Sequence, residues 1–338
     1  MEKLNIMKYN SKNAIRWLIV FIIIIIVTIW QRDLVVSAIK EIFRIPVYIT
    51  CACVILMMLY FMTEGMIIKI IANENASGLK WTDGVRCSLF SAFYKTATLG
   101  TGSGVAEIYY LGTKGIKTAQ STCITLSQYT VQKITLTLFG CAGYVFILLQ
   151  GENNVLEYRQ WIVTGLAASI LVSGGLFGIS YSEKLSGRIK KIIAHIFKNN
   201  NERKEKLSIR VSEFNNTGKK IWNRKTGILI ILNILKFTAW YSIPMVIYLH
   251  EYNLQPVHIC YMAVINMLAG VMAAPAGVGT FEYVFMRFYG ERYGVLAATA
   301  LILYRFFTMI VPMFIGGIYG GTDKNQYKKG NKKWKEKR

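Results

Sequence analysis

A short run of glycines that ends in a glutamate occurs twice in the chain, and its residue types suit the binding of an anion such as phosphate. Glycine permits a sharp reversal of the backbone and a close approach of other groups. A helix that begins just after such a turn presents unpaired N–H groups and the positive end of its dipole. The two copies, which lie 175 residues apart, are Gly100-Thr-Gly102-Ser-Gly104-Val-Ala-Glu107 and Pro275-Ala-Gly277-Val-Gly279-Thr-Phe-Glu282.

The similarity between the copies continues beyond the motif without a gap. At the same offset the matching pairs are Gly115 with Gly290, Lys117 with Arg292, and Tyr129 with Tyr304. A packing kink between helices would explain one glycine cluster. Two clusters in a repeated unit favour a substrate site where broken helices meet, as in many secondary transporters built from inverted repeats. We expect the repeat cores at about 85–149 and 256–320.

Acidic and basic side chains also interrupt the apolar segments, at Glu64, Glu107, Lys133, Lys236, Glu282 and Arg305. Each basic side chain costs about 2.5 to 3.5 kcal/mol at the centre of a membrane helix, which a run of leucine and isoleucine can absorb. We expect these charges to converge on one polar cavity, together with the motif glycines. Structural pairing, for instance of Glu282 with Arg305 and of Glu107 with Lys133, is the alternative, and the two interpretations are compatible.

The composition identifies lipid as the solvent of most of the chain. Of the 338 residues 53% are hydrophobic, and the net charge is +22. Three segments, 1–16, 183–226 and 322–338, carry net charges of +3, +9 and +6, and each flanks an apolar run. This distribution follows the rule that lysine and arginine stay on the cytoplasmic side, and it excludes nucleic acid as a partner.

Cysteine and histidine give no sign of metal or redox chemistry. The six cysteines lie within or beside apolar segments, where free cysteine behaves as a small hydrophobic residue. The three histidines are far apart, and none stands at ligand spacing from a cysteine. We therefore expect no disulfide, no metal site and no cofactor. No nucleophile has a base at helical spacing, so no catalytic residue is predicted.

Six apolar runs are long enough to cross a bilayer, and the predicted fold class is an all-α integral membrane protein. The runs are 15–30, 46–71, 118–149, 161–181, 227–249 and 294–320. The first follows a basic start and reads as a signal anchor rather than a cleaved peptide. Two further segments, 85–111 and 256–290, are interrupted by the glycine clusters. If each dips in and returns, all three basic segments face the cytoplasm, and the two re-entrant hairpins enter from opposite sides.

The predicted domains are a cytoplasmic N-terminus (1–14), a transmembrane domain (15–320) and a basic cytoplasmic tail (321–338). Within the basic loop 183–226, apolar residues recur at helical spacing from Leu185 to Ile196, with lysine and arginine between them. This pattern predicts an interfacial helix on anionic lipid, and the alternative is a solvated loop.

The second copy of the motif resembles the membrane region of lysylphosphatidylglycerol synthases, the multiple peptide resistance factor family with its stand-alone flippase-like relatives. Residues 275–282, followed by Leu303-Tyr-Arg305 and Pro312, are similar to that family's Pro-Gly-Gly-x-Gly-x-x-Glu and Tyr-Arg elements. The first copy departs from the family. Tyr109 and Tyr110 stand where an arginine is usual, and Thr130 occupies the place of a second arginine, which leaves Lys133 as a substitute.

The resemblance, over residues 12–320, implies movement of an anionic or aminoacylated phospholipid between leaflets and resistance to cationic peptides. It also implies a multi-pass protein of the bacterial cytoplasmic membrane with both termini inside. Family members with a soluble transferase domain transfer lysine to phosphatidylglycerol, whereas only a basic tail follows Gly320 here. We expect no aminoacyl transfer by this polypeptide itself.

Phospholipids of the phosphatidylglycerol type are thus the expected partners, and homo-oligomerisation is left open. Two other functions remain as alternatives to lipid translocation. One is a membrane subunit of a lipid-modifying enzyme, such as a phosphatidylglycerol lysyltransferase, whose catalytic domain is on another chain. The other is a passive scaffold, which predicts that the buried charges can be neutralised without effect.

Overall fold

A computed structural model describes residues 32–74, 78–98, 102–150, 159–197, 201–248, 257–271 and 279–318, and every regular element among them is a helix. Five helical segments are long and apolar enough to cross a membrane. They are α3 (Val47–Asn73), α6 (Thr118–Leu149), α7 (Arg159–Tyr181), α10 (Thr226–Tyr248), and α13 (Val295–Arg305) together with its continuation to Ile318. Helices suit lipid because they satisfy every backbone N–H and C=O within the segment.

These helices confirm five of the six predicted spans, and the bounds of α6 agree with the prediction to the residue. The first predicted span, 15–30, lies outside the described residues.

Directly after Arg305 the last span contains a π-helix, η3 (Phe306–Ile310). Such wide turns inside α-helices occur frequently at functional sites.

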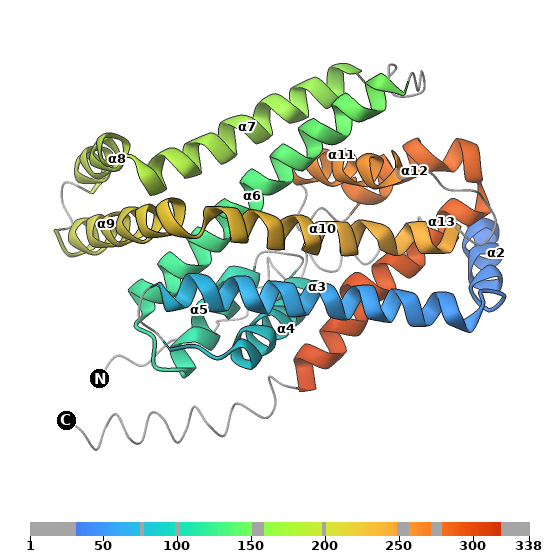
Figure 1. Ribbon diagram of the computed structural model, residues 1–338, viewed down its shortest axis with the longest axis horizontal. Coiled ribbons are helices and arrows are strands. Elements are labelled where there is room, and N and C mark those ends of the chain that lie inside the picture. Colours follow the sequence, from blue (N-terminus) through green and yellow to red (C-terminus); the bar gives the residue numbers. More distant parts are fainter. Residues whose placement is uncertain are drawn as a thin grey trace, which may run out of the picture.

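Two pairs of shorter helices occupy the segments that were predicted as hairpins. The first pair is α4 (Trp81–Ala97) with α5 (Ser103–Thr113), and the second is α11 (Val257–Val271) with α12 (Thr280–Tyr293). Their lengths of 17, 11, 15 and 14 residues fall short of the ~20 that a bilayer requires. Figure 1 shows α4 and α5 towards the end of the molecule that carries α9, and α11 and α12 towards the end that carries α2 (Arg32–Ile42).

The helix bounds repeat with the offset found in the sequence. Moved by 175 residues, α4, α5 and α6 would begin at 256, 278 and 293, whereas α11, α12 and α13 begin at 257, 280 and 295. Three successive helices therefore begin at nearly the same offset in the two segments. The residues that join the helices within each pair, 99–101 and 272–278, lie outside the described part of the chain.

Small residues bring the first pair close to its neighbours. A Cβ atom on Gly84 of α4 would lie 2.2 Å from the carbonyl oxygen of Gly65 on α3. On the other side of α4, a Cβ atom on Gly316 of the last span would lie 2.1 Å from the carbonyl oxygen of Leu89. Membrane helices often associate through such small residues because lipid supplies little hydrophobic driving force between them.

The basic loop folds into two helices, α8 (Glu183–Ile196) and α9 (Asn201–Arg224), at one end of the bundle. The side chain of Ser182 accepts a hydrogen bond from the Leu185 N–H and so caps α8. Lys219 of α9 donates a hydrogen bond to Glu183 of α8, which lowers the pKa of that carboxyl. The helix predicted in this loop is present, and the polar helix α9 was not anticipated.

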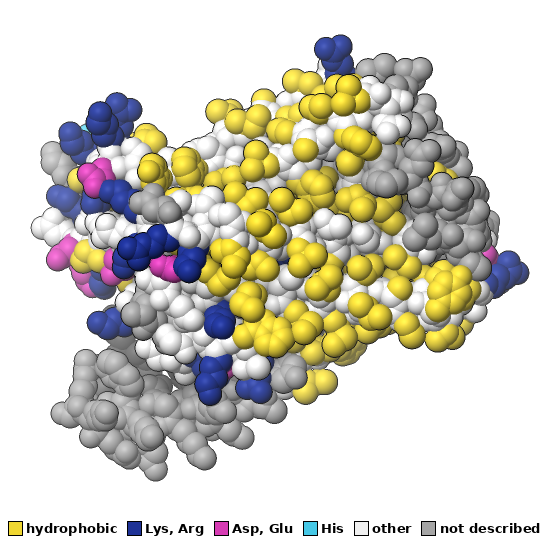
Figure 2. All heavy atoms as spheres, in the orientation of Figure 1, with side chains coloured by type: hydrophobic (Ala, Val, Ile, Leu, Met, Phe, Trp, Pro, Cys, Tyr) yellow, Lys and Arg dark blue, Asp and Glu magenta, His cyan; other side chains and the backbone are white. Residues whose placement is uncertain are grey.

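The outer surface divides into an apolar belt and a basic end. Figure 2 shows hydrophobic side chains over the middle of the molecule, and lysine and arginine gathered at the end that carries α8 and α9. Exposed apolar residues of the belt come from separate spans and include Ile55, Leu171 and Ile231. This pattern is the one expected of helices that face lipid acyl chains.

Candidate functional site

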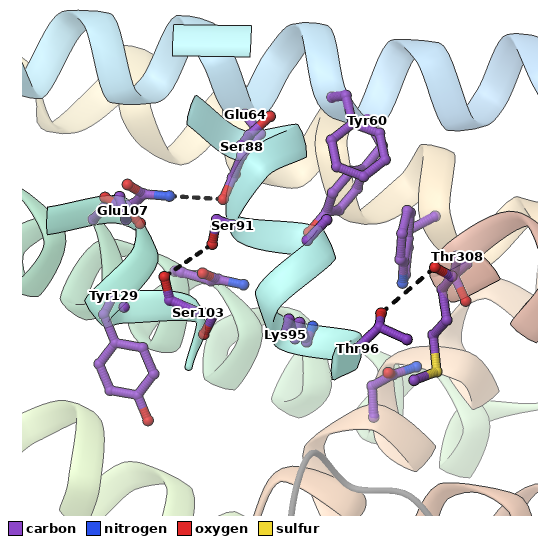
Figure 3. Close-up of a pocket in the computed structure, with 18 of the residues that line it drawn as sticks. Tyr60, Glu64, Ser88, Ser91, Lys95, Thr96, Ser103, Glu107, Tyr129 and Thr308 are labelled. Carbon is purple, nitrogen blue, oxygen red and sulfur yellow. Dashed lines mark hydrogen bonds between the residues drawn. The ribbon is translucent and has the colours of Figure 1, made fainter. Parts of the chain in front are cut away.

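A cavity of about 490 Å³ lies between the two helix pairs and the long spans. All four short helices line it, together with α3, α6, α10, α13 and η3. Figure 3 shows part of its wall, where Ser91 of α4 donates a hydrogen bond to the Ser103 carbonyl of α5 at 3.1 Å. The charged residues of the wall are Glu64, Lys95, Glu107, Lys133 and Arg305.

One wall of the cavity contains a buried ion pair between two long spans. Lys236 of α10 is fully buried, and its Nζ lies 2.7 Å from Oε2 of Glu64 on α3. The other oxygen, Glu64 Oε1, accepts a hydrogen bond of 2.7 Å from Gln128 Nε2 of α6. A buried charge is costly unless a counter-ion and hydrogen bonds compensate it, and both are present here. Lys236, a predicted site residue, therefore acts on the cavity through Glu64.

The second motif glutamate is held by the chain itself. Glu282 Oε1 accepts a hydrogen bond of 2.6 Å from Arg305 Nε, and Oε2 accepts one of 2.6 Å from the Gly279 N–H. Gly279, with φ 86°, precedes the first residue of α12, so Glu282 caps its own helix. The predicted pairing of Glu282 with Arg305 is confirmed. The expectation that the N-terminus of α12 is open to an anion is wrong at Gly279, because the Glu282 carboxylate already binds that N–H.

Arg305 keeps some binding capacity despite this pairing. Its guanidinium carbon lies 4.6 Å from the centre of the Phe281 ring, a distance typical of a cation–π contact. Its Nη2 is buried and has no hydrogen-bond partner among the described residues. The Thr308 hydroxyl, which lies on η3 and also lines the cavity, is without a partner in the same sense. Both are donors at the wall that a bound group could satisfy.

The first motif glutamate, Glu107, has no cation partner in the part of the chain that the structure describes. Glu107 is 6% exposed, and its Oε1 accepts one hydrogen bond, 3.0 Å long, from the Thr125 hydroxyl of α6. The expected ion pair with Lys133 is not present among the described residues, and Lys133 Nζ lies instead 5.5 Å from the centre of the Tyr129 ring. The sequence suggested that Glu107 and Lys133 pair, but both side chains line the cavity without an ion pair between them.

Lys95 is a cavity residue that the sequence analysis did not single out. It lies near the end of α4, and its side chain is exposed within the cavity wall (Figure 3). Among the described residues it forms no ion pair. A signal was available, because Lys95 stands five residues before Gly100 inside an apolar segment. Among the described residues, the cavity thus has three cationic groups, on Lys95, Lys133 and Arg305, and of these only Arg305 has a carboxylate partner.

The motif glycines have different places in the structure. Gly104 lines the cavity, and Gly102 is the N-cap of α5, where its N–H donates to the Thr98 hydroxyl at 2.7 Å. The N-terminus of α5 is therefore also partly occupied by the chain's own side chain. The remaining three predicted residues, Gly100, Pro275 and Gly277, lie outside the described residues.

Aromatic rings form an apolar wall next to these charges. The rings of Tyr60 and Trp240 lie 3.8 Å apart between their centres, and those of Phe281 and Tyr304 stack at 5.1 Å. All four line the cavity. A ligand here would meet cations, one unpaired carboxylate and a flat apolar surface, which suits an amphiphile with both a phosphate and an ammonium group. Within the described residues no three histidine, cysteine or acidic side chains are grouped as metal ligands would be.

Searches of the curated proteins and of the solved structures found no match. The sequence model of the family described as "Lysylphosphatidylglycerol synthase TM region" matches residues 15–316, nearly the whole chain. The chain is therefore a multi-pass membrane protein that belongs to the family of lysylphosphatidylglycerol synthase transmembrane regions.

Proposed function

We propose that the protein moves an anionic or aminoacylated phospholipid, of the lysylphosphatidylglycerol type, between the two leaflets of the bacterial cytoplasmic membrane. The observation that carries this proposal is a charged cavity inside a bundle whose outer surface is apolar. A cavity so costly to place in lipid is retained for a polar cargo. The family match supports a lipid related to lysylphosphatidylglycerol.

The cavity offers separate contacts for each part of such a lipid. The phosphate meets the ammonium groups of Lys95 and Lys133 and the free Nη2 of Arg305. A headgroup ammonium meets Glu107. The aromatic wall of Tyr60 and Trp240 packs against the glycerol and the first methylenes, while the acyl chains stay along the outer apolar belt.

The arrangement of the helix pairs suggests how access alternates. By the positive-inside rule the α8 and α9 end faces the cytoplasm, so the α4–α5 pair enters from the cytoplasm and the α11–α12 pair from outside. Rocking of one repeat against the other would then expose the cavity to each leaflet in turn. Movement of a cationic lipid to the outer leaflet lowers the negative surface charge that attracts cationic peptides, which supports a role in resistance.

Reconstitution into liposomes tests the proposal directly. A fluorescent phosphatidylglycerol and its lysyl ester are placed in both leaflets, and leaflet exchange is measured by quenching from outside. We expect wild-type protein to accelerate exchange, and Lys95→Ala, Lys133→Ala and Arg305→Ala each to slow it about tenfold or more, because one charge-assisted contact contributes about 1.5 to 3 kcal/mol. Lys219→Ala removes a lysine outside the cavity and should exchange lipid like wild type.

Equal exchange in all variants, at the rate of empty liposomes, would contradict the proposal. In that case the second candidate gains weight: a membrane subunit of a lipid-modifying enzyme whose transferase is a separate chain. The family description, which names a synthase, favours this candidate. It predicts that gentle purification retains a transferase and that deletion changes the amount of lysylphosphatidylglycerol in the cell rather than its leaflet.

A further inference from the structure

Building on the proposed function, we propose that Glu107 is a proton-exchange site. Its carboxyl group holds a proton while the cavity is empty and gives it up when the ammonium group of a lipid headgroup binds there. The movement of a cationic lipid in one direction is thereby coupled to the movement of a proton in the other. The lipid's chemistry follows from the function proposed above, whereas the exchange follows from the surroundings of Glu107.

Burial without a counter-ion distinguishes this carboxyl group from its neighbours. Glu107 is 6% exposed, yet its only hydrogen bond among the described residues comes from the Thr125 hydroxyl. One neutral donor compensates little of the cost of an isolated buried carboxylate, and such a group takes up a proton instead. As a carboxylic acid it can still accept the bond from Thr125 through its carbonyl oxygen.

The charged and titratable groups on the surrounding helices do not supply the missing charge. Glu64 of α3 and Lys236 of α10 have opposite electrostatic effects on Glu107, and the two are paired with each other at 2.7 Å. From α4, Cys87 lies within electrostatic range, and Lys95 lines the same cavity without an ion pair. From α6, Lys133 likewise lines the cavity without contacting Glu107. At the base of the helix pair, Asp83 is paired with Lys114 at 3.0 Å.

Neither of the other two acids can take this role. Glu64 has Lys236 and Gln128 on its two oxygens, and Glu282 has Arg305 and the Gly279 N–H. Each therefore already has a cation that belongs to the protein. Of these three acids, Glu107 alone has no cation among the described residues, and the cavity of about 490 Å³ beside it has room for a headgroup and water.

The exchange balances in atoms and charge. The O–H bond of Glu107 breaks, the proton passes to cavity water, and the carboxylate that remains forms an ion pair with the arriving ammonium group. When the lipid leaves, a proton from the other side restores the acid. The cavity therefore carries the same net charge in both states, which avoids the cost of an unpaired charge at membrane depth at either stage.

Proton release on binding is the direct measurement. Purified full-length protein in weakly buffered detergent near neutral pH is mixed with a short-chain lysyl ester of phosphatidylglycerol, with phosphatidylglycerol itself, or with the permethylated lysyl ester. The permethylated ester has quaternary ammonium groups and no dissociable proton on them, so any proton must come from the protein. A pH-sensitive dye reports protons, and tryptophan fluorescence reports binding.

We expect about one proton per bound cationic lipid and none for phosphatidylglycerol, because only a cation substitutes for the proton on the carboxyl group. Glu107→Gln should release none, and Glu202→Gln, which alters an exposed carboxylate on α9, should release as much as wild type. The release should disappear at high pH, where the acid has already ionised. Binding of the permethylated ester to wild type without a proton, or equal release by Glu107→Gln, overturns the inference.

The outcomes also separate this inference from the function on which it rests. If no lipid binds and no leaflet exchange occurs, the proposed function fails. If cationic lipid binds and exchanges without proton release, only the proton-exchange role fails. Infrared spectroscopy adds a readout that does not require the glutamine variant to fold: lipid-free wild type should show the C=O band of a protonated carboxylic acid, the lysyl ester should remove it, and Glu107→Asp should shift it. Absence of that band in wild type contradicts the proposal.

Discussion

The two helix pairs carry the same motif but give its glutamate opposite surroundings. In the second pair, Glu282 is bonded on both oxygens, by Arg305 of α13 and by the Gly279 N–H. In the first pair, Glu107 is more deeply buried and has one neutral hydrogen-bond donor, Thr125 of α6. Glu282 thus joins the N-terminus of α12 to α13, whereas Glu107 remains available to a ligand.

The partner positions explain this difference. At the 175-residue offset, Arg305 corresponds to Thr130, whose hydroxyl bonds to the Leu126 carbonyl of its own helix. Conversely, Thr125 corresponds to Ala300, which has no side-chain donor. The partner of the glutamate thus comes from a different position of the following helix in each copy. A repeated motif need not mean a repeated role. The first copy departs from the family pattern, and its glutamate, Glu107, is the one without a cation partner among the described residues.

The largest loss of stability is expected when Glu64, like Glu107, is left without a cation. Lys236→Met leaves Glu64 buried without its cation, which should lower the free energy of unfolding by about 3–5 kcal/mol. Titration with SDS in mixed micelles measures this quantity. Adding Glu64→Gln to the same chain should restore most of the loss, because no uncompensated charge then remains.

Lys69→Met makes the same chemical change on a partly buried lysine of α3 that has no ion pair among the described residues. It should cost less than about 1 kcal/mol. A similar loss in Lys69→Met and Lys236→Met would show that the Glu64 pair contributes little.

The next prediction tests how closely the first helix of each helix pair packs against its neighbours. Gly84→Ala would place a methyl group 2.2 Å from the Gly65 carbonyl oxygen, so α3 and α4 must separate, at a cost of about 1–3 kcal/mol. The corresponding position in the second copy is Ile259, which already packs a side chain against the core, and Ile259→Val should cost about 0.5–1.5 kcal/mol. An unchanged midpoint of SDS unfolding for Gly84→Ala would contradict the close contact between the helices.

A smaller loss is expected for the paired glutamate. Glu282→Gln removes the charge opposite Arg305, where the two side chains are 30% and 21% exposed. The cost should be about 1–2 kcal/mol, between those of exposed and buried pairs. Arg305→Lys should not replace arginine fully, because the Nε bond and the contact with Phe281 need the guanidinium. Full stability of Glu282→Gln would mean that the N-terminus of α12 does not depend on this carboxylate.

The sequence predicted much of the fold because apolar length is a strong signal in lipid. Hydropathy located α3, α6, α7, α10 and α13, and the 175-residue offset anticipated the matching helix starts. It did not predict α9, which is polar on average but buries Phe214 and Ile221. This helix packs on α7, with Trp222 Nε1 donating to Ser180 Oγ at 2.9 Å. Its apolar residues Leu207, Val211, Phe214 and Ile221 recur at helical spacing, but the many charged residues between them lower the hydropathy of the segment.

The site was predictable in its members more than in its pairings. Intramembrane charges and motif glycines identified most of the cavity, since each is expensive at membrane depth. Which charge meets which depends on helix rotation, and that is why Lys236 reaches Glu64 while Lys133 misses Glu107. Lys95 was not among the predicted residues, although a lysine inside an apolar segment is itself a signal of a functional site.

The smallest effect on stability, and the sharpest test of the comparison, is expected at Glu107. Glutamine has the shape of a protonated glutamate and keeps an oxygen for the Thr125 hydroxyl, so Glu107→Gln should change the free energy of unfolding by less than about 1 kcal/mol. Leaflet exchange of the lysyl ester should nevertheless fall, because glutamine cannot give up a proton and form the carboxylate that would pair with the ammonium group. The two motif glutamates would then separate, with Glu282→Gln affecting stability more and Glu107→Gln affecting transport more. If Glu107→Gln destabilises the protein as much as Glu282→Gln does, Glu107 is ionised and paired at rest, and the distinction between the two halves is lost.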